Sequence, residues 1–144
     1  MSIWYAPHGP LTIDDIRARY DVGLSAYLGI RLTAIGDDFL QGTMPVLPRV
    51  HQPMGLLHGG ASVVLAESLG SIGANLCVDY PRVRCVGQEI NANHVRGVAE
   101  GLVTGTARPL HLGARSQVWQ IEIRDPTEEL VCISRLTIAV IGSR

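Results

Sequence analysis

A single carboxylate stands inside an otherwise apolar stretch of this chain. Between Arg49 and Asp79 the only formally charged residue is Glu67, and leucine and isoleucine residues recur around it every three or four positions. This spacing predicts a helix with one continuous apolar face, and small residues occupy its other face. Burying a carboxylate in such a helix costs free energy unless a partner or a reaction uses it. Glu67 is therefore either a hydrogen-bonded residue at a helix contact or a catalytic group.

Two glycines, Gly59 and Gly60, fall at the predicted start of this helix, directly after His58. Each weakens the helix by up to about 1 kcal/mol relative to alanine. In return they expose backbone N–H groups that have no partner within the helix and lie at the positive end of its dipole. Such groups can hold a carbonyl oxygen or a developing oxyanion. The glycines alone predict only a tight turn, but together with Gln52 and Glu67 they predict a site that acts on an ester or thioester carbonyl.

Gly59 and Glu67 are too far apart on one helix to act on the same bond. Glu67 follows Gly59 by eight residues, which is about 12 Å at 1.5 Å per residue. Two such helices packed antiparallel across a two-fold axis would place Gly59 of one subunit near Glu67 of the other, so we expect an active site shared between subunits. Ser71 lies one turn after Glu67 on the same face, where its hydroxyl either orients the carboxylate or a water, or bonds the carbonyl four residues earlier.

The stretch QPMGLLHGGASVVLAESLGS at residues 52–71 resembles the signature of hotdog-fold acyl-CoA thioesterases that carry HGG and a helical glutamate. The similarity continues in GQEINANHVR at 87–96, PLHLG at 109–113 and VWQIEI at 118–123, and so covers nearly the whole chain. Within this superfamily, which includes 4-hydroxybenzoyl-CoA and phenylacetic-acid-pathway thioesterases, the sequence is most similar to two groups. These are the bacterial 1,4-dihydroxy-2-naphthoyl-CoA thioesterases and the siderophore-pathway proofreading thioesterases.

The resemblance implies a role for each residue singled out above. Glu67 would attack the thioester carbonyl as a nucleophile or activate water as a general base, and the sequence leaves both open. The Gly59 amide would polarise the thioester oxygen, while Gln52 and His58 would position the carbonyl and help the thiolate leave. The alternative for His58 is a residue that caps the helix or packs against it. We expect no metal, since His51, His58 and Glu67 lack the spacing of a helix-borne ligand pair, and no cofactor beyond the coenzyme A of the substrate.

Coenzyme A carries phosphates and an adenine, so its site should offer arginine, histidine and backbone N–H groups near the surface. Two segments that match the family supply such groups and, by the resemblance, line the CoA channel. They contain Gly87, His94, Val95, Arg96 and Gly97, and His111, Leu112, Gly113, Ala114, Arg115 and Ser116. The alternative for Arg96 and Arg115 is a solvated charge at a strand end. Gly97 and Ala114 stand where close relatives more often have hydroxyl side chains. Two possible contacts to the CoA phosphates are therefore in doubt, while the proposed catalytic residues are unaffected.

The composition fits one domain, residues 1–144, with 47% hydrophobic residues and a substantial core. A net charge of −1 provides no basic footprint for nucleic acid or for a membrane surface. The N-terminus lacks a signal-peptide pattern and no apolar run reaches the length of a membrane span, so we expect a cytoplasmic protein. The three cysteines, Cys77, Cys85 and Cys132, show no CxxC spacing and are expected to be free buried thiols.

The predicted elements follow an order that one architecture satisfies. An N-terminal helical segment spans residues 1–28; Thr12 begins its first helix, and Tyr27 and Leu28 are expected in the core. A central helix is predicted at 58–78, with strands at 30–35, 39–46, 84–95, 101–112, 115–124 and 130–141. A long helix wrapped by a curved antiparallel sheet accommodates this order, and it is the α+β hotdog fold that the resemblance implies. The last strand is apolar on both faces, which favours subunit association, and the resemblance implies a tetramer built as a dimer of dimers.

Three functions compete. The first is hydrolysis of acyl-CoA thioesters, with 1,4-dihydroxy-2-naphthoyl-CoA of the menaquinone and phylloquinone pathway as the first candidate, and broad-range or acyl-carrier-protein proofreading activity as the alternative. The second is a hotdog hydratase or dehydratase, but those enzymes carry a loop rich in proline and phenylalanine where this chain has Gly59 and Gly60. The third is a non-catalytic acyl-CoA-binding module, which has no need of a carboxylate at Glu67. Thioester hydrolysis accounts for the most features.

Overall fold

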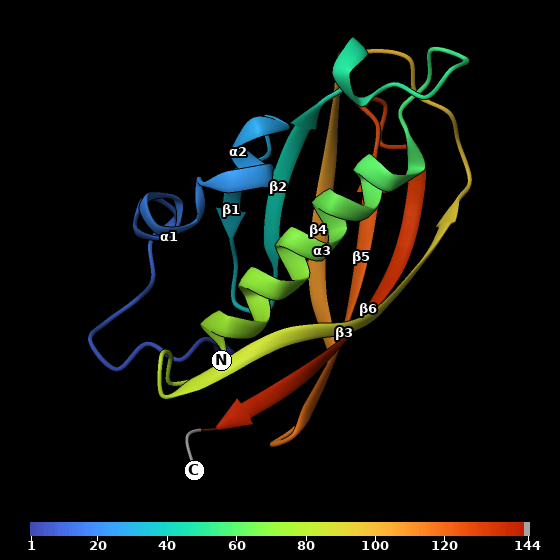
Figure 1. The fold of residues 1–144 in the computed structure, drawn as a ribbon. Coiled ribbons are helices and arrows are strands. Elements are labelled where there is room, and N and C mark those ends of the chain that lie inside the picture. Colours follow the sequence, from blue (N-terminus) through green and yellow to red (C-terminus); the bar gives the residue numbers. More distant parts are fainter. Residues whose placement is uncertain (143–144) are drawn as a thin grey trace.

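The computed structural model describes residues 1–142, which form one six-stranded antiparallel sheet and a long helix that lies across it (Figure 1). The elements are α1 (Ile13–Tyr20), α2 (Gly23–Tyr27), β1 (Arg31–Ile35), β2 (Leu40–Pro45), the short 3-10 helix η1 (Pro48–Val50), α3 (Gly59–Leu76), β3 (Val83–His94), β4 (Leu102–Leu112), β5 (Ser116–Arg124) and β6 (Leu130–Gly142). The strand order is β1-β2-β4-β5-β6-β3, and each neighbouring pair is antiparallel. The predicted central helix and all six predicted strands are confirmed.

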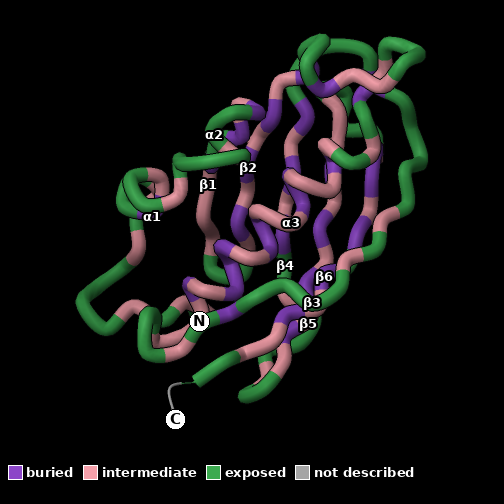
Figure 2. The backbone as a smooth tube through the Cα atoms, in the orientation of Figure 1, coloured by how far each residue is buried: buried purple, intermediate pink, exposed green. Residues whose placement is uncertain are grey.

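The helix α3 packs directly on the sheet because its inner face combines large apolar and very small residues. Leu65 and Leu69 are fully buried, and the tube in Figure 2 shows buried positions along both the helix and the strands beneath it. A Cβ added to Gly70 would stand 2.6 Å from a methyl carbon of Leu136, and one on Gly73 would stand 2.9 Å from the Trp119 ring. The two glycines therefore set how closely the helix approaches the sheet.

The strands alternate as expected for a half-buried antiparallel sheet. In β5 the side chains of Trp119, Ile121 and Ile123 are fully buried, while their neighbours face the outer surface and are only partly covered. In β6 the side chains of Cys132, Leu136 and Ile138 are fully buried on one face, and Ile133 on the other face is half-buried in the single chain. One face of the sheet therefore packs against α3, and the other is open to solvent or to a second protomer.

The N-terminal segment covers one edge of α3. One of its residues lies elsewhere than the sequence predicts. The Thr12 hydroxyl accepts a hydrogen bond from the Asp15 N–H at 3.2 Å, so Thr12 is the N-cap of α1 as predicted. Leu28 is buried, but Tyr27 is 72% exposed, and its predicted place in the core was wrong. The physical reason is that α2 has five residues and only one inner side. Ser25, whose hydroxyl lies 3.0 Å from that of a serine in α3, is on that side, and Tyr27 projects from the opposite one.

The strand β3 is an edge of the sheet and is tied to the end of α3 by a side chain. The Asn75 amide accepts a hydrogen bond from the Cys85 N–H and donates one to the Cys85 carbonyl, both at 2.9 Å. A bulge then interrupts the pairing of β3 with β6 between Gly87 and Glu89. Together the Asn75 hydrogen bonds and the bulge determine the path by which β3 passes over α3.

The cysteines are free, as predicted. Burial raises the pKa of Cys77 to about 12, with Cys85 nearby adding to the rise, and burial also raises the pKa of Cys85 to about 11. Thiols with such pKa values stay protonated and are poor nucleophiles. Among residues 1–142 there is no helix with the length and apolar character to cross a bilayer, and no group of three His, Cys, Asp or Glu side chains suited to hold a metal.

Candidate active site

The first turn of α3 leaves one backbone N–H free. His58 is the N-cap, and its ring Nδ1 accepts a hydrogen bond from the Gly60 N–H at 2.8 Å. Its carbonyl accepts hydrogen bonds from the N–H groups of Ala61 at 2.9 Å and Ser62 at 3.2 Å. Within residues 1–142 the Gly59 N–H has no partner. This donor therefore remains available to a ligand, at the positive end of the helix dipole.

The capping interpretation of His58 is confirmed, and it fixes the state of the ring. Because Nδ1 accepts the bond from Gly60, the neutral ring carries its proton on Nε2. His58 is exposed, so this Nε2–H can meet a group outside the chain. The cap does not contradict a catalytic role for His58, because the two roles use different nitrogens.

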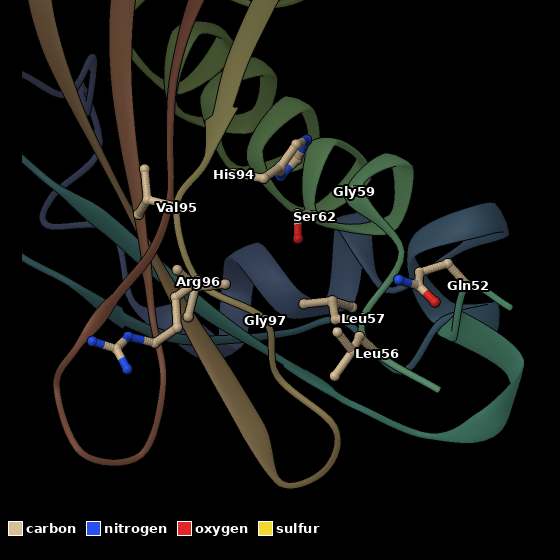
Figure 3. Close-up of a pocket in the computed structure, with 10 residues that line it drawn as sticks. Gln52, Leu56, Leu57, Gly59, Ser62, His94, Val95, Arg96 and Gly97 are labelled. Atoms are coloured by element: carbon tan, nitrogen blue, oxygen red, sulfur yellow. The ribbon is translucent and has the colours of Figure 1, made fainter. Parts of the chain in front are cut away.

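A cavity of about 350 Å³ opens beside the first turn of α3 (Figure 3). Its walls come from the loop before α3, from the start of α3, from the end of β3 with the loop that follows, and from β6. They consist of Gln52, Leu56, Leu57, Gly59, Ser62, His94, Val95, Arg96, Gly97 and Val131. A Cβ on Gly59 would stand 2.7 Å from Nε2 of His94, so the imidazole packs against the Gly59 backbone. The cavity thus joins two predicted catalytic residues with four predicted CoA-binding residues.

A tight turn brings Gln52 back to the start of α3. The Gln52 N–H donates to the Leu56 carbonyl at 2.8 Å, and the Gly55 N–H donates to the Gln52 carbonyl at 2.9 Å. Gly55 has a φ of +76°, a conformation that glycine adopts without strain. The side-chain oxygen of Gln52 accepts a hydrogen bond from the Met54 N–H. Its amide nitrogen has no partner among residues 1–142, so Gln52 offers a second N–H donor on the wall that holds Gly59.

Arg96 and Gly97 are exposed residues in the lining of the cavity, and we call their side of it the mouth. The Arg96 side chain is 49% exposed and pairs with Glu129 at 3.2 Å. A Cβ on Gly97 would stand 3.0 Å from a methyl carbon of Leu56, so glycine keeps this wall thin. A guanidinium at this exposed position can bind the phosphates of a long ligand, and its exposed ion pair with Glu129 is weak enough to be exchanged for them.

Glu67 lies outside this cavity, halfway along α3. Its carboxylate packs against Gly87 of β3, where a Cβ would overlap Oε1. Desolvation raises the pKa of Glu67 above its ordinary value of 4.5. In the described part of the chain this carboxylate has no hydrogen-bond or ion-pair partner, so the interpretation as a hydrogen-bonded helix contact has no support within one protomer. Within residues 1–142 the Ser71 hydroxyl makes no hydrogen bond, either to this carboxylate or to the carbonyl four residues earlier, while the Ser71 carbonyl accepts one from the Asn75 side chain at 2.9 Å.

The second predicted CoA-binding segment is far from the first in a single chain. His111 and Leu112 end β4, and the remaining residues up to Ser116 form the turn into β5, where the Gly113 N–H donates to the Ser116 carbonyl at 2.9 Å. Because β3 and β4 run in opposite directions, their last residues lie at opposite ends of the sheet (Figure 1). One protomer therefore does not bring the two segments together, and Gly87 also lies outside the cavity.

The cavity includes residues that the sequence did not single out. Leu57, Ser62 and Val131 line it and are all buried. Ser62 follows Gly59 by one helical turn, so its position on the same side of α3 was a signal that sequence reasoning could have used. Val131 comes from β6, and nothing local predicts its place, because it depends on the order of strands in the sheet.

Comparison with known proteins identifies the family. Residues 54–132 match the family model described as the thioesterase superfamily, which is more than half of the chain. The chain belongs to the thioesterase superfamily. A 1,4-dihydroxy-2-naphthoyl-CoA hydrolase from Escherichia coli is 53% identical over 131 residues, which cover 91% of this chain and 96% of the relative. A putative esterase from Vibrio cholerae is 54% identical over 144 residues, which cover 100% of this chain and 93% of the relative.

A solved structure agrees with this thioesterase assignment. The crystal structure of a mutant thioesterase from Pseudomonas aeruginosa superposes with a TM-score of 0.92 at 46% identity, and the match covers 99% of this chain and 100% of that one. The hotdog fold and the thioester-hydrolase activity that the sequence resemblance implied are confirmed. The matched region of the family model contains the start of α3, Glu67 and the end of β3, and it begins two residues after Gln52.

Proposed function

We propose that this thioesterase hydrolyses aryl-CoA thioesters to the free acid and coenzyme A, with 1,4-dihydroxy-2-naphthoyl-CoA as the first candidate substrate. The observation that carries the proposal is the unpartnered Gly59 N–H, which opens into a cavity with Arg96 at its mouth. The relative named for this substrate, at 53% identity, supports the choice of acyl group. The reaction would belong to quinone biosynthesis in the cytoplasm and would need no cofactor, because coenzyme A is part of the substrate.

The start of α3 would act on the thioester carbonyl. Its oxygen would accept hydrogen bonds from the Gly59 N–H and the Gln52 amide, two donors that have no partner in the described chain. As the carbonyl carbon becomes tetrahedral, the charge on the oxygen grows and both bonds strengthen. Loss of one such donor typically slows an enzyme by about 10²- to 10³-fold. His58 would donate its Nε2–H to the departing thiolate.

The carboxylate would come from a second protomer. Glu67 is outside the cavity of its own chain, and it is about 12 Å from Gly59 along the helix. A two-fold axis that sets two α3 helices antiparallel would bring Glu67 of one protomer to the cavity of the other. The same operation would carry the β4–β5 turn, at the far end of the sheet, toward the Arg96 side of the neighbouring cavity. Two such dimers would make the tetramer that the family resemblance implies.

Two chemical routes fit this arrangement. In the first, Glu67 attacks the carbonyl carbon, the C–S bond breaks, and the thiolate leaves; water then hydrolyses the mixed anhydride and regenerates the carboxylate. In the second, Glu67 takes a proton from a water that attacks the same carbon, and that proton passes to the thiolate. Both routes require the ionised carboxylate and both give one acid and one coenzyme A per water consumed.

The deciding experiment measures thiol release from a panel of thioesters with the wild-type protein, Glu67→Ala and Glu67→Gln. The panel contains 1,4-dihydroxy-2-naphthoyl-CoA, 4-hydroxybenzoyl-CoA, a medium-chain alkyl-CoA and an aryl thioester of an acyl carrier protein. We expect the wild type to turn over the aryl-CoA esters best, and both variants to lose several orders of magnitude in kcat while remaining folded. Binding of CoA esters without thiol release would instead indicate a non-catalytic module, and full activity of Glu67→Ala would assign Glu67 a structural role.

A further inference from the structure

The Ser62 hydroxyl is a buried polar group with no partner in its own chain. Ser62 is 2% exposed. A helical serine often bonds the carbonyl four residues earlier, but that carbonyl belongs to His58 and already accepts from the N–H groups of Ala61 and Ser62 itself. Within residues 1–142 the hydroxyl makes no hydrogen bond. The hydroxyl can therefore bond a water or a ligand, and a ligand that covers it without offering a partner would leave it unpaired at a cost in free energy.

This hydroxyl opens into the cavity beside Gly59. Ser62 lines the cavity, and Figure 3 shows its oxygen directed into the open space. Another buried hydroxyl, on Ser134, is sealed from the surface without a partner, whereas the oxygen of Ser62 is not sealed. Ser62 follows Gly59 by three residues, a rise of about 4.5 Å along the helix. A ligand whose carbonyl oxygen binds the Gly59 N–H can therefore present to Ser62 an atom that lies three bonds from its carbonyl carbon.

The two ends of the cavity differ, and the difference orients the substrate. The mouth carries the exposed Arg96 and Gly97, while the inner end is closed by Leu57 and Val131, which are 9% and 3% exposed. Coenzyme A is long and highly charged, so it must extend from the thioester through the mouth into solvent. The acyl group then occupies the inner end, against two apolar side chains and the hydroxyl of Ser62.

We propose that Ser62 determines specificity: its Oγ hydrogen bonds a ring hydroxyl adjacent to the thioester carbonyl, so the site selects hydroxyaryl thioesters over unsubstituted ones. This inference rests on the proposed function and adds a residue to it. A site that contains a buried hydroxyl discriminates strongly against a substrate that lacks the matching group, because the hydroxyl then stays unpaired. An apolar wall at position 62 would accept both substrates without that penalty.

The test compares 1-hydroxy-2-naphthoyl-CoA with 2-naphthoyl-CoA, which differ by one hydroxyl, in the wild type and in Ser62→Ala. We expect the ratio of kcat/KM between the two substrates to fall about tenfold in Ser62→Ala, the size of one buried hydrogen bond. Alanine is a strong helix former, so the variant is expected to fold. The matched control is Ser68→Ala on the same helix: the Ser68 hydroxyl lies 3.0 Å from that of Ser25, away from the cavity, and its loss should leave the ratio unchanged.

The outcomes separate this inference from the proposed function. If Ser62→Ala slows both thioesters equally, or if the wild type does not prefer the hydroxylated substrate, the assignment of Ser62 is overturned while aryl-CoA hydrolysis stands. If the wild type hydrolyses alkyl-CoA esters and neither naphthoyl ester, the assignment of Ser62 and the proposed aryl-CoA hydrolysis are both wrong. Binding of the free acids by calorimetry gives a second measurement, in which Ser62→Ala should lose affinity for 1-hydroxy-2-naphthoic acid and keep that for 2-naphthoic acid.

Discussion

The carboxylate of Glu67 occupies the space that a side chain on Gly87 would need. Gly87 does not have a positive φ, so its backbone conformation is open to other residues. What requires glycine is the oxygen of Glu67, which a Cβ would overlap. The edge strand β3 and the helix α3 therefore meet at the proposed catalytic group, and the fit between them fixes where the carboxylate points.

Gly87→Ala should displace the Glu67 carboxylate and leave the fold intact, because the clash involves the end of a flexible side chain. A shift of about 1 Å in a catalytic group costs on the order of 100-fold in rate, so we expect kcat for thiol release to fall by about that factor. Gly142→Ala is the matched control in another strand, since a Cβ there meets nothing within 4 Å. A Gly87→Ala enzyme with wild-type kcat would show that activity does not depend on the placement of the Glu67 carboxylate against Gly87.

Gly59→Pro should remove the proposed oxyanion donor, and its Cβ should also displace the His94 ring, whose Nε2 would lie 2.7 Å away. Gly59 is the first residue of α3, where proline is favoured and the lost N–H has no helical partner. The preceding residue, His58, has ψ 129°, which is compatible with a following proline. We expect kcat to fall by about 10²- to 10³-fold with little change in melting temperature. Gly59→Ala, whose Cβ displaces His94 in the same way but which keeps the N–H, is the control and should retain much more activity than Gly59→Pro.

Mixing two inactive variants should restore activity if the site is shared between protomers. In a mixed dimer of Gly59→Pro and Glu67→Gln, one site carries both defects and the other carries neither. Random pairing makes half of the dimers mixed, so the specific activity should recover to about a quarter of the wild-type value. The measurement is thiol release after co-expression, with each variant alone as the baseline. Absence of any recovery, with mixed dimers shown to form, would place Gly59 and Glu67 of one protomer in the same site.

The raised pKa of Glu67 should appear in both activity and stability. Because both proposed routes need the ionised form, kcat/KM should decline on the acid side at a pH above the ordinary glutamate pKa of 4.5. The folded protein favours the protonated form, so stability from this group is full below the unfolded pKa and is lost as pH rises through the folded pKa. Glu67→Gln should therefore melt higher than the wild type near neutral pH, and the difference should close as the pH falls below about 4.5. A wild type that is the more stable protein at neutral pH would contradict the sign of this shift.

His58 can be divided into its two roles by substitution. His58→Ala removes the N-cap and should lower the free energy of unfolding by about 1 kcal/mol, together with activity. His58→Asn supplies another capping oxygen and should recover the stability, but it offers no imidazole N–H to the leaving thiolate. Denaturant unfolding and thiol-release assays on the two variants test this. If His58→Asn recovers activity along with stability, the cap is the whole role of His58.

The local patterns of the sequence predict the elements well, because each element carries its own signal. The apolar spacing around Glu67 predicts α3 to within two residues at either end, and alternation around Trp119 predicts β5. Thr12 likewise marks the start of α1. These signals depend on contacts within one helix turn or one strand, which neighbouring residues determine.

The sequence does not predict which residues share the cavity, because that depends on the order of strands in the sheet. It also does not predict which way side chains point on an element as short as α2. The placement of β3 beside β6 decides that Val131 and His94 share a cavity, and no local pattern encodes that order. The same antiparallel order separates Arg96 from Arg115, although both stand near strand ends. Tyr27 was misplaced because a helix as short as α2 has too few residues to reveal its inner face.

The bond between Asn75 and Cys85 limits how β3 can recruit a neighbour. An exposed strand edge invites further strands to add, and such growth can continue into fibres. Here one side-chain amide occupies both the N–H and the carbonyl of Cys85, in the way that a neighbouring strand would. A strand added to this edge therefore cannot pair with Cys85 unless the Asn75 side chain moves away. The helix that carries Glu67 thus also shields part of the exposed edge of β3.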